Sequence, residues 1–218
     1  LFLEEAWHAI EDAGYDPHSL AGTKGGVFVG VKDAHYLSER YTHEESHIFP
    51  FSGNTLGLVA SRIAYFLDFK GSCIVLDTEC SSSLVSIHLA CQRLLDGSDE
   101  FALAGGICLL LSPKVFVSLS KAGMLAPDGR CKTFDHRADG IGIGEGVGVV
   151  MLKTLSRALH DGDRPYAVIR GSAMNQDGKT SGITAPNGPS QQNLALEIYR
   201  KTKFDPSGLG YVEAHGPG

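Results

Sequence analysis

A cysteine stands between two predicted elements in a setting that is typical of a nucleophile. Cys80 follows the short apolar run 72–76, which predicts a buried strand, and precedes a stretch with helical spacing. That stretch predicts a helix ending near Gly97, with an apolar stripe made of Leu84, Ile87, Cys91, Leu94 and Leu95. N–H groups at a helix N-terminus carry partial positive charge, so they favour a thiolate and can bind an oxyanion. The sequence therefore predicts a strand-to-helix turn that presents a reactive thiol.

A cysteine that only fills space is the alternative interpretation of Cys80. Three small polar residues follow it directly, namely Ser81, Ser82 and Ser83, and the first two are also good helix caps. A packing cysteine needs no such neighbours. A nucleophile that takes up a bulky acyl group needs small side chains and a tight turn. The serines therefore favour a nucleophile.

A second motif points to metal chemistry. His43 and His47 lie in the segment HEESH, which matches the zinc-protease pattern HExxH. That pattern works on a long helix with a third ligand downstream, whereas this segment is strongly polar and is followed by Pro50 and Gly53. A solvated loop or short surface helix explains it as well. A zinc hydrolase that uses His43 and His47 stays open as an alternative function.

The glycine-rich run 140–148 resembles a nucleotide-binding loop only in composition. Its spacing does not fit GxGxxG, and it precedes a predicted strand instead of joining a strand to a helix. Close backbone packing is the better explanation of these glycines.

Two polar segments and a histidine complete the candidates. Residues 175–180 and 184–189 are dense in turn formers, so we expect loops that either line a pocket or have a purely structural role. His215 closes the predicted strand 211–214, a position from which a side chain can reach a site at the strand end.

The composition is that of an ordinary soluble globular protein, with 218 residues, 43% hydrophobic and 20% charged. No apolar run approaches the roughly 18 residues that span a bilayer, and no signal peptide is visible, so we expect a cytoplasmic protein without a membrane partner. The net charge of −6 argues against nucleic acid as a partner. Five cysteines without CxxC spacing indicate neither a disulfide framework nor a zinc knuckle.

Strand and helix patterns alternate along the chain, which predicts an α/β fold with much parallel sheet. The first helix pattern begins at residue 1 without a capping residue, so we expect a fragment of a longer protein. A second helix is expected to be capped by Asn54 and to carry a stripe of Leu56, Val59, Ile63 and Phe66. Strands are predicted at 26–30, 72–76, 101–111, 147–152, 166–171 and 211–214, and helices at 1–14, 54–66, 81–97 and 190–201.

Five ordered blocks resemble the β-ketoacyl synthase (ketosynthase) domain of modular type I polyketide synthases over nearly the whole chain. They are DTECSSSLVSIHLAC, GMLAPDGRCKTFDHRADG, GEGVGVVMLK, NQDGKTSGITAPNGPSQ and YVEAHG. The resemblance implies a thiolase-like fold, a layered αβαβα arrangement, and a homodimer when full length. On it, residues 1–218 form a partial domain, with the later part of the N-terminal half at about 1–150 and the start of the C-terminal half at about 151–218.

The resemblance also assigns roles to two residues. Cys80 matches the nucleophile that takes the acyl chain from an acyl carrier protein as a thioester. His215 matches the first of two histidines that promote decarboxylation of a carrier-bound malonyl-type extender and stabilise the enolate. The implied enzyme is an acyltransferase that performs decarboxylative Claisen condensation. Because the family's second histidine and lysine would follow Gly218, the isolated fragment is expected to be inactive.

Cofactors and partners follow from the same resemblance. No intrinsic cofactor is implied, because the substrates are carried on the phosphopantetheine of the acyl carrier protein. Expected partners are that carrier protein and other polyketide synthase domains, such as the acyltransferase. A fatty-acid ketosynthase and a catalytically silent fold partner remain alternatives, although the presence of Cys80 argues against a silent partner.

The chain departs from the family pattern at two positions. Glu79 stands where alanine is usual, and a carboxylate on the same side as Cys80 would raise the thiol pKa. Neighbouring side chains in extended backbone point apart, which weakens that effect. Pro217 replaces a threonine whose hydroxyl is expected to contact the pantetheine arm.

Overall fold

The computed structural model describes residues 1–32, 52–53 and 55–217. The chain divides into two compact units, one formed by Leu1–Arg164 with His215–Gly218 and the other by Pro165–Ala214. Within the described residues, no helix is both long and apolar enough to span a bilayer.

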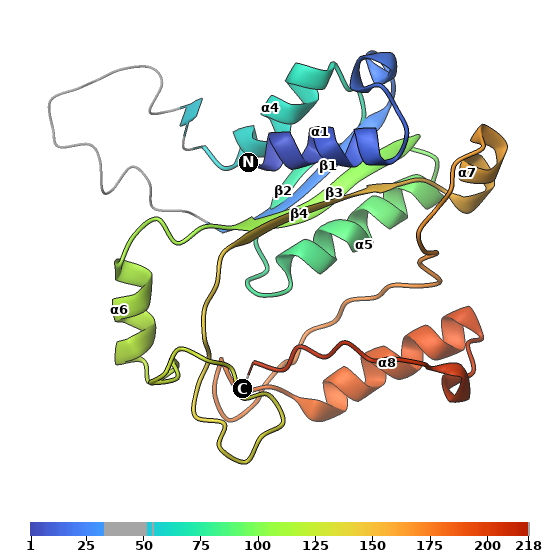
Figure 1. Ribbon diagram of the computed structural model, residues 1–218. Coiled ribbons are helices and arrows are strands. Elements are labelled where there is room, and N and C mark those ends of the chain that lie inside the picture. Colours follow the sequence, from blue (N-terminus) through green and yellow to red (C-terminus); the bar gives the residue numbers. More distant parts are fainter. Residues whose placement is uncertain (33–51, 54, 218) are drawn as a thin grey trace, which may run out of the picture. The chain divides into compact units, whose positions relative to one another are not determined.

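A four-stranded sheet forms the centre of the first unit, with the strand order β2-β1-β3-β4 (Figure 1). β1 pairs in parallel with β2 and with β3, whereas β4 runs antiparallel to β3. The four strands confirm four of the six predicted ones, and the two parallel pairings confirm the expected parallel character of the sheet, to which β4 adds one antiparallel edge strand. Their bounds are Gly25–Val31 for β1, Cys73–Leu76 for β2, Phe101–Cys108 for β3 and Gly146–Leu152 for β4.

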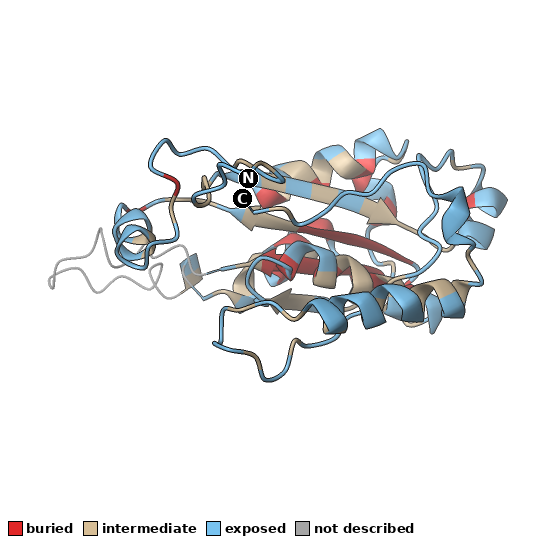
Figure 2. Cartoon of the chain, turned by 90° about the horizontal axis from the view of Figure 1, so that it is seen from below, coloured by how far each residue is buried: buried red, intermediate tan, exposed pale blue. Residues whose placement is uncertain are grey.

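Helices cover both faces of this sheet. α1 (Phe2–Asp12) and α4 (Gly57–Leu67) lie on one face and α5 (Ser82–Leu95) lies on the other (Figure 1). Side chains alternate along β1, so Val27 and Val29 pack with α1 and α4, while Phe28 packs with α5. The buried residues line these two interfaces (Figure 2). The remaining helices are η1 (Pro17–Leu20), α6 (Lys114–Lys121), α7 (Leu155–Asp161), α8 (Gly188–Thr202) and η2 (Pro206–Gly208).

The predicted apolar stripes were partly wrong. Of the predicted stripe in α5, only Leu94 is buried, and the other buried residues of this helix are small, namely Ser82, Ser86 and Ala90. Leu84 and Leu95 are 71% and 76% exposed, because the helix face that carries mostly small side chains packs against the sheet. In α4, Ile63 is buried as expected, but Phe66 is 58% exposed. β2 is an edge strand and is only half-buried, which corrects the prediction of a buried strand.

The second unit contains the helix α8 and the short 3₁₀ helix η2, but no strand. α8 confirms the predicted helix at 190–201, and the Asn187 side chain caps it by accepting a hydrogen bond from the N–H of Ser190. The predicted strands at 166–171 and 211–214 were wrong, since neither segment pairs with another among the described residues. The expected cap Asn54 lies outside the described residues.

Candidate active site

The turn between β2 and α5 is built by hydrogen bonds among its own side chains. Asp77 Oδ1 accepts a hydrogen bond from the N–H of Glu79 at 2.8 Å. Ser82 Oγ accepts from the N–H of Thr78 at 2.9 Å and donates to the Glu79 carbonyl at 2.7 Å. Ser81 Oγ donates to the Thr78 carbonyl at 2.9 Å. The serines therefore shape the turn from within, which explains why small hydroxyl residues follow the cysteine.

Cys80 lies in this turn as an exposed, free thiol directly before the N-cap residue Ser81. The predicted position of the thiol, between a strand and a helix, is confirmed. Ser81 stands at the N-cap position, but its side chain makes no capping bond, because its hydroxyl is used within the turn. The expected end of the helix near Gly97 is also confirmed, since α5 ends at Leu95 and Gly97 takes a φ of +76°.

Glycines in the central strands let α5 approach the sheet closely. A Cβ at Gly30 of β1 would lie 2.5 Å from the backbone carbon of Ser82. A Cβ at Gly106 of β3 would lie 2.7 Å from the Cβ of Ser83. Farther along the helix, Ser86 Oγ lies 2.8 Å from the Gly105 carbonyl. The first turn of α5 thus rests on glycine backbone, which fixes the height of Cys80 above the sheet.

These supporting residues were missed in the sequence. The signal was present, because Ser82, Ser86 and Ala90 recur at a spacing of four residues and make a small-residue stripe on one helix face. The predicted stripe of larger apolar residues instead placed Leu84 and Leu95 in the interface with the sheet, and both are exposed.

Glu79 has an unusual backbone and a cationic partner. Its φ of 56° lies in the left-handed region, which is uncommon for a residue other than glycine. Its carboxylate accepts hydrogen bonds of 2.8 and 2.7 Å from Lys32 Nζ, just after β1. The hydrogen bond to Glu79 raises the pKa of Lys32, and burial opposes this rise only in part. No feature of the sequence alone indicated Lys32.

His215 lies in an extended segment after the second unit and is exposed. A hydrogen bond fixes the residue after the histidine: the Gly216 carbonyl accepts it from Thr133 Oγ1 at 2.5 Å. Gly216 has a φ of +46°, and a Cβ there would lie 2.4 Å from Thr133 Cγ2. His215 belongs to the same compact unit as Cys80. Among the described residues, no hydrogen bond or ion pair joins the two side chains.

The other sequence motifs have separate outcomes. His43 and His47 lie outside the described residues, and the described part of the chain contains no group of three or more His, Cys, Asp or Glu that could hold a metal. Close backbone packing of the glycine run 140–148 is confirmed at Gly140 and Gly142, but not at Gly144, Gly146 and Gly148, where a Cβ would meet nothing within 4 Å. A Cβ at Gly140 would lie 2.4 Å from the backbone nitrogen of Ala126, and one at Gly142 would lie 2.2 Å from the Gly129 carbonyl oxygen.

The polar segments 175–180 and 184–189 are tied to the start of α8. Asn175 Nδ2 donates to the Ser190 carbonyl at 2.9 Å, and Asn187 Nδ2 donates to the Asp177 carbonyl at 2.7 Å. These bonds support the structural interpretation of the two segments within the second unit.

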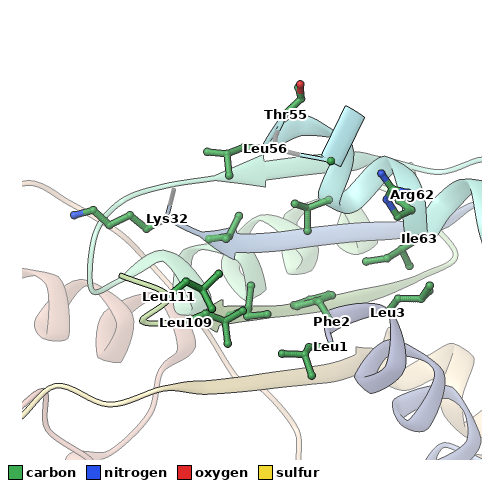
Figure 3. A pocket seen from close by; sticks show the side chains of 14 residues that line it. Leu1, Phe2, Leu3, Lys32, Thr55, Leu56, Arg62, Ile63, Leu109 and Leu111 are labelled. Carbon is green, nitrogen blue, oxygen red and sulfur yellow. The ribbon is translucent and has the colours of Figure 1, made fainter. Parts of the chain in front are cut away.

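A cavity of about 350 Å³ lies in the first unit between α1, α4 and the ends of β1 and β3 (Figure 3). Its lining is mostly apolar, with Lys32 and Arg62 as its charged residues. The Lys32 ammonium points away from the other labelled side chains (Figure 3). The apolar lining residues include Phe2, Leu3, Leu56, Ile63, Leu109 and Leu111.

Solved structures define the class to which this fold belongs. The ketosynthase from module 6 of the bacillaene synthase from Bacillus subtilis 168 matches with a TM-score of 0.91 and 44% identity, over 99% of this chain and 37% of that chain. The oxazolomycin ketosynthase domain OzmH KS7 from Streptomyces albus matches with a TM-score of 0.90 and 40% identity, over 100% of this chain and 39% of that chain. The fold is therefore thiolase-like.

Sequence comparison gives the family. The model of the β-ketoacyl synthase N-terminal domain matches residues 1–158, and that of the C-terminal domain matches residues 166–218. The chain belongs to the β-ketoacyl synthase family. It is 47% identical over 221 residues to the polyketide synthase GfsA of Streptomyces halstedii, spanning all of this chain and 3% of that protein.

Proposed function

We propose that this chain is part of a polyketide synthase ketosynthase, which transfers an acyl group to Cys80 and then performs decarboxylative Claisen condensation. The observation that carries the proposal is the exposed Cys80 thiol in a strand-to-helix turn of a β-ketoacyl synthase. The similar proteins named above are polyketide synthase components, which favours a polyketide over a fatty-acid ketosynthase.

The first step is acyl transfer. The Cys80 thiolate attacks the carbonyl carbon of a carrier-bound thioester, a new C–S bond forms at Sγ, and the bond to the carrier sulfur breaks. N–H groups at the start of α5 are suited to stabilise the oxyanion that forms on the way. The surrounding serines leave room for an acyl chain, because their side chains are small and engaged within the turn.

The second step uses His215 as a donor to the extender. A carrier-bound malonyl-type extender loses CO₂, and the resulting enolate oxygen is stabilised by a hydrogen bond from the imidazole. The enolate carbon then attacks the Cys80 thioester, which gives a β-ketoacyl chain on the carrier and regenerates the thiolate. The exposure of His215 in this chain leaves its ring accessible to such a substrate.

Further features follow from the same proposal. The substrates reach the site on phosphopantetheine, so the partners are an acyl carrier protein and neighbouring domains such as the acyltransferase, and no intrinsic cofactor takes part. The location is the cytoplasm and the complete domain is a homodimer. We assign about 1–150 to the N-terminal half and about 151–218 to the C-terminal half. Because the chain spans 37% of the bacillaene ketosynthase, we expect it to be inactive alone.

Intact-mass labelling of the full-length domain tests the function. The domain is exposed to an acyl-thioester mimic or to cerulenin, and wild type is compared with Cys80→Ala. We expect one acyl adduct that is lost in Cys80→Ala and kept in Cys131→Ala, a matched variant that removes another exposed thiol. An adduct that persists in Cys80→Ala would refute Cys80 as the acyl acceptor.

A further inference from the structure

The ion pair beside the nucleophile joins two parts of the sheet edge. β1 and β2 are parallel and in register, with Gly30 opposite Leu76, so the residues after both strands emerge at the same edge. Lys32 follows β1 and Glu79 follows β2, and they meet at 2.7 Å. The pair therefore lies immediately next to Cys80 because of strand register, although 47 residues separate its members.

The backbone of Glu79 is held on both sides. Its N–H donates to Asp77, and its carbonyl accepts from the N–H of Ser82 at 3.1 Å as well as from the Ser82 hydroxyl. These bonds keep the residue at its φ of 56°. The backbone of Glu79 is thus fixed at the turn, and the residue that carries this carboxylate directly precedes Cys80.

Stability is a weak reason for this ion pair. The side chains of Lys32 and Glu79 are 63% and 70% exposed, and ion pairs this exposed to solvent contribute little to folding stability. The effect of the pair on local charge is larger, because an uncompensated carboxylate next to a thiol disfavours the thiolate. Among the described residues, the charged and titratable groups that act on Lys32 are Glu79, Asp77 and Cys80 itself.

We propose that Lys32 is a positioning residue for the Cys80 nucleophile, which neutralises the Glu79 carboxylate and keeps the turn favourable to a thiolate. The inference rests on the proposed role of Cys80 as acyl acceptor. Two carboxylates, Asp77 and Glu79, flank the turn, and Lys32 supplies the cation that offsets them. Its aliphatic stem lines the apolar cavity while its ammonium points out of it (Figure 3), which is the arrangement of a snorkelling lysine.

The test measures the alkylation rate of Cys80 by iodoacetamide as a function of pH in the full-length domain, with peptide mass spectrometry as readout. The variants are Lys32→Gln, Glu79→Gln and the double variant. Lys70→Gln is the matched control, because Lys70 is also exposed and also paired with an acidic residue of positive φ, Asp68. Lys70 precedes β2 whereas Cys80 follows it, so the control removes the same charge at the opposite end of the strand.

We expect Lys32→Gln to slow alkylation of Cys80 near neutral pH by about threefold to tenfold and to move the pH midpoint of the alkylation rate upward. Glu79→Gln should not slow the reaction, and the double variant should return to within about twofold of wild type, because it removes the uncompensated charge together with its partner. High salt should shrink the difference between Lys32→Gln and wild type. Lys70→Gln should match wild type.

A purely structural role of Lys32 would give a different pattern of alkylation rates. If Lys32 only held the turn in place, then Lys32→Gln, Glu79→Gln and the double variant would be equally slow, and that result would overturn the proposal. A pH profile of Lys32→Gln that coincides with wild type would overturn it as well. The alkylation rate of Cys91, a half-buried thiol of α5, is measured in the same samples and reports whether a variant has lost its fold.

The failure of this proposal is separable from the failure of the proposed function. Wild-type domain is treated in parallel with an acyl-thioester mimic, and the Cys80 adduct is measured. Absence of acylation together with a Lys32-dependent alkylation profile would reject the acyl acceptor and, with it, the catalytic meaning of Lys32. Normal acylation together with a Lys32-independent profile would reject only the positioning role.

Discussion

The nucleophile turn and the segment 165–214 differ in what holds them in place. The turn rests on a sheet whose central strands contain fully buried residues such as Val27 and Leu103. No residue of 165–214 is buried in this chain, and the regular structure of this segment consists of α8 and the short η2, with local hydrogen bonds around the start of α8. Both regions carry sequence blocks of the same family, yet among the described residues only the first contains buried side chains.

The difference shows which kinds of structure are locally determined. α8 forms because its cap and its hydrogen bonds lie within a few residues of each other. The segments 166–171 and 211–214 have the composition of strands, but a strand needs a partner to satisfy its N–H and C=O groups. Among the described residues neither segment has one, so the pattern remains without a strand.

Cavity formation in the core of the first unit should have the largest effect. Ile63 of α4 is 1% exposed, so Ile63→Ala is expected to lower the free energy of unfolding by about 2–5 kcal/mol. Tyr65→Ala, on the same helix but at a residue that is 90% exposed, should change it by about 0.5 kcal/mol or less. Hydrogen exchange should show the loss in β1 and β3. An equal loss of protection from exchange in α8 would contradict the comparison, because it would show that the two regions unfold as one cooperative unit.

Crowding under the nucleophile turn should come next. Gly30→Ala places a Cβ 2.5 Å from the backbone carbon of Ser82. Overpacking of this kind lowers the free energy of unfolding by about 1–3 kcal/mol. The displaced turn should also change the alkylation rate of Cys80. Gly188→Ala is the control, because a Cβ there meets nothing within 4 Å. Unchanged stability and unchanged Cys80 reactivity in Gly30→Ala would contradict the close support of the turn.

Loss of the α8 cap should have a smaller and more local effect. Asn187→Ala removes the bond to the Ser190 N–H and the bond to the Asp177 carbonyl, which should cost about 0.5–2 kcal/mol. Asn193→Ala changes the same residue type at an exposed position inside the helix and should leave protection equal or slightly higher. The measurement is hydrogen exchange of α8, with β1 and β3 as the internal reference.

Acid should weaken the first unit through the charged cluster around Asp161, the last residue of α7. Hydrogen bonds from His160, Lys153 and Arg157 hold the pKa of Asp161 well below its ordinary value. A depressed pKa stabilises the folded state above about pH 4, the unfolded value, and this contribution is lost as pH falls toward the folded value. Asp161→Asn should therefore shift the acid-unfolding midpoint only slightly and flatten the pH dependence below pH 4. An unchanged slope would show that Asp161 does not contribute.

The same cluster has an opposite dependence on the basic side. Burial lowers the pKa of Lys153, but the carboxylates of Asp161 and Asp163 outweigh burial and raise it. The contribution of a raised lysine pKa is complete below about pH 10.4, the unfolded value, and fades as pH rises beyond it. A stability profile that is flat between neutral and mildly alkaline pH is therefore expected of this cluster, measured by thermal unfolding at several pH values.

Much of the fold could be predicted from local pattern, and the errors have a common cause. The four paired strands and the helices α1, α4, α5 and α8 were found because hydrophobic period and turn residues are written in consecutive positions. The buried face of α5 was misjudged, since which face a helix buries depends on the surface beneath it. Here Gly30 and Gly106 admit serines instead of leucines.

The sequence by itself determined the family, the position of Cys80 between a strand and a helix, and the proposal that this thiol accepts an acyl chain. These follow from residues that are neighbours in the chain. Only the tertiary structure brought Lys32 to Glu79 and placed glycines under the first turn of α5. It also showed that 166–171 and 211–214 have no strand partner in the part of the chain that the structure describes. The physical reason is that strand register and layer packing are set by contacts between distant segments, which no local pattern encodes.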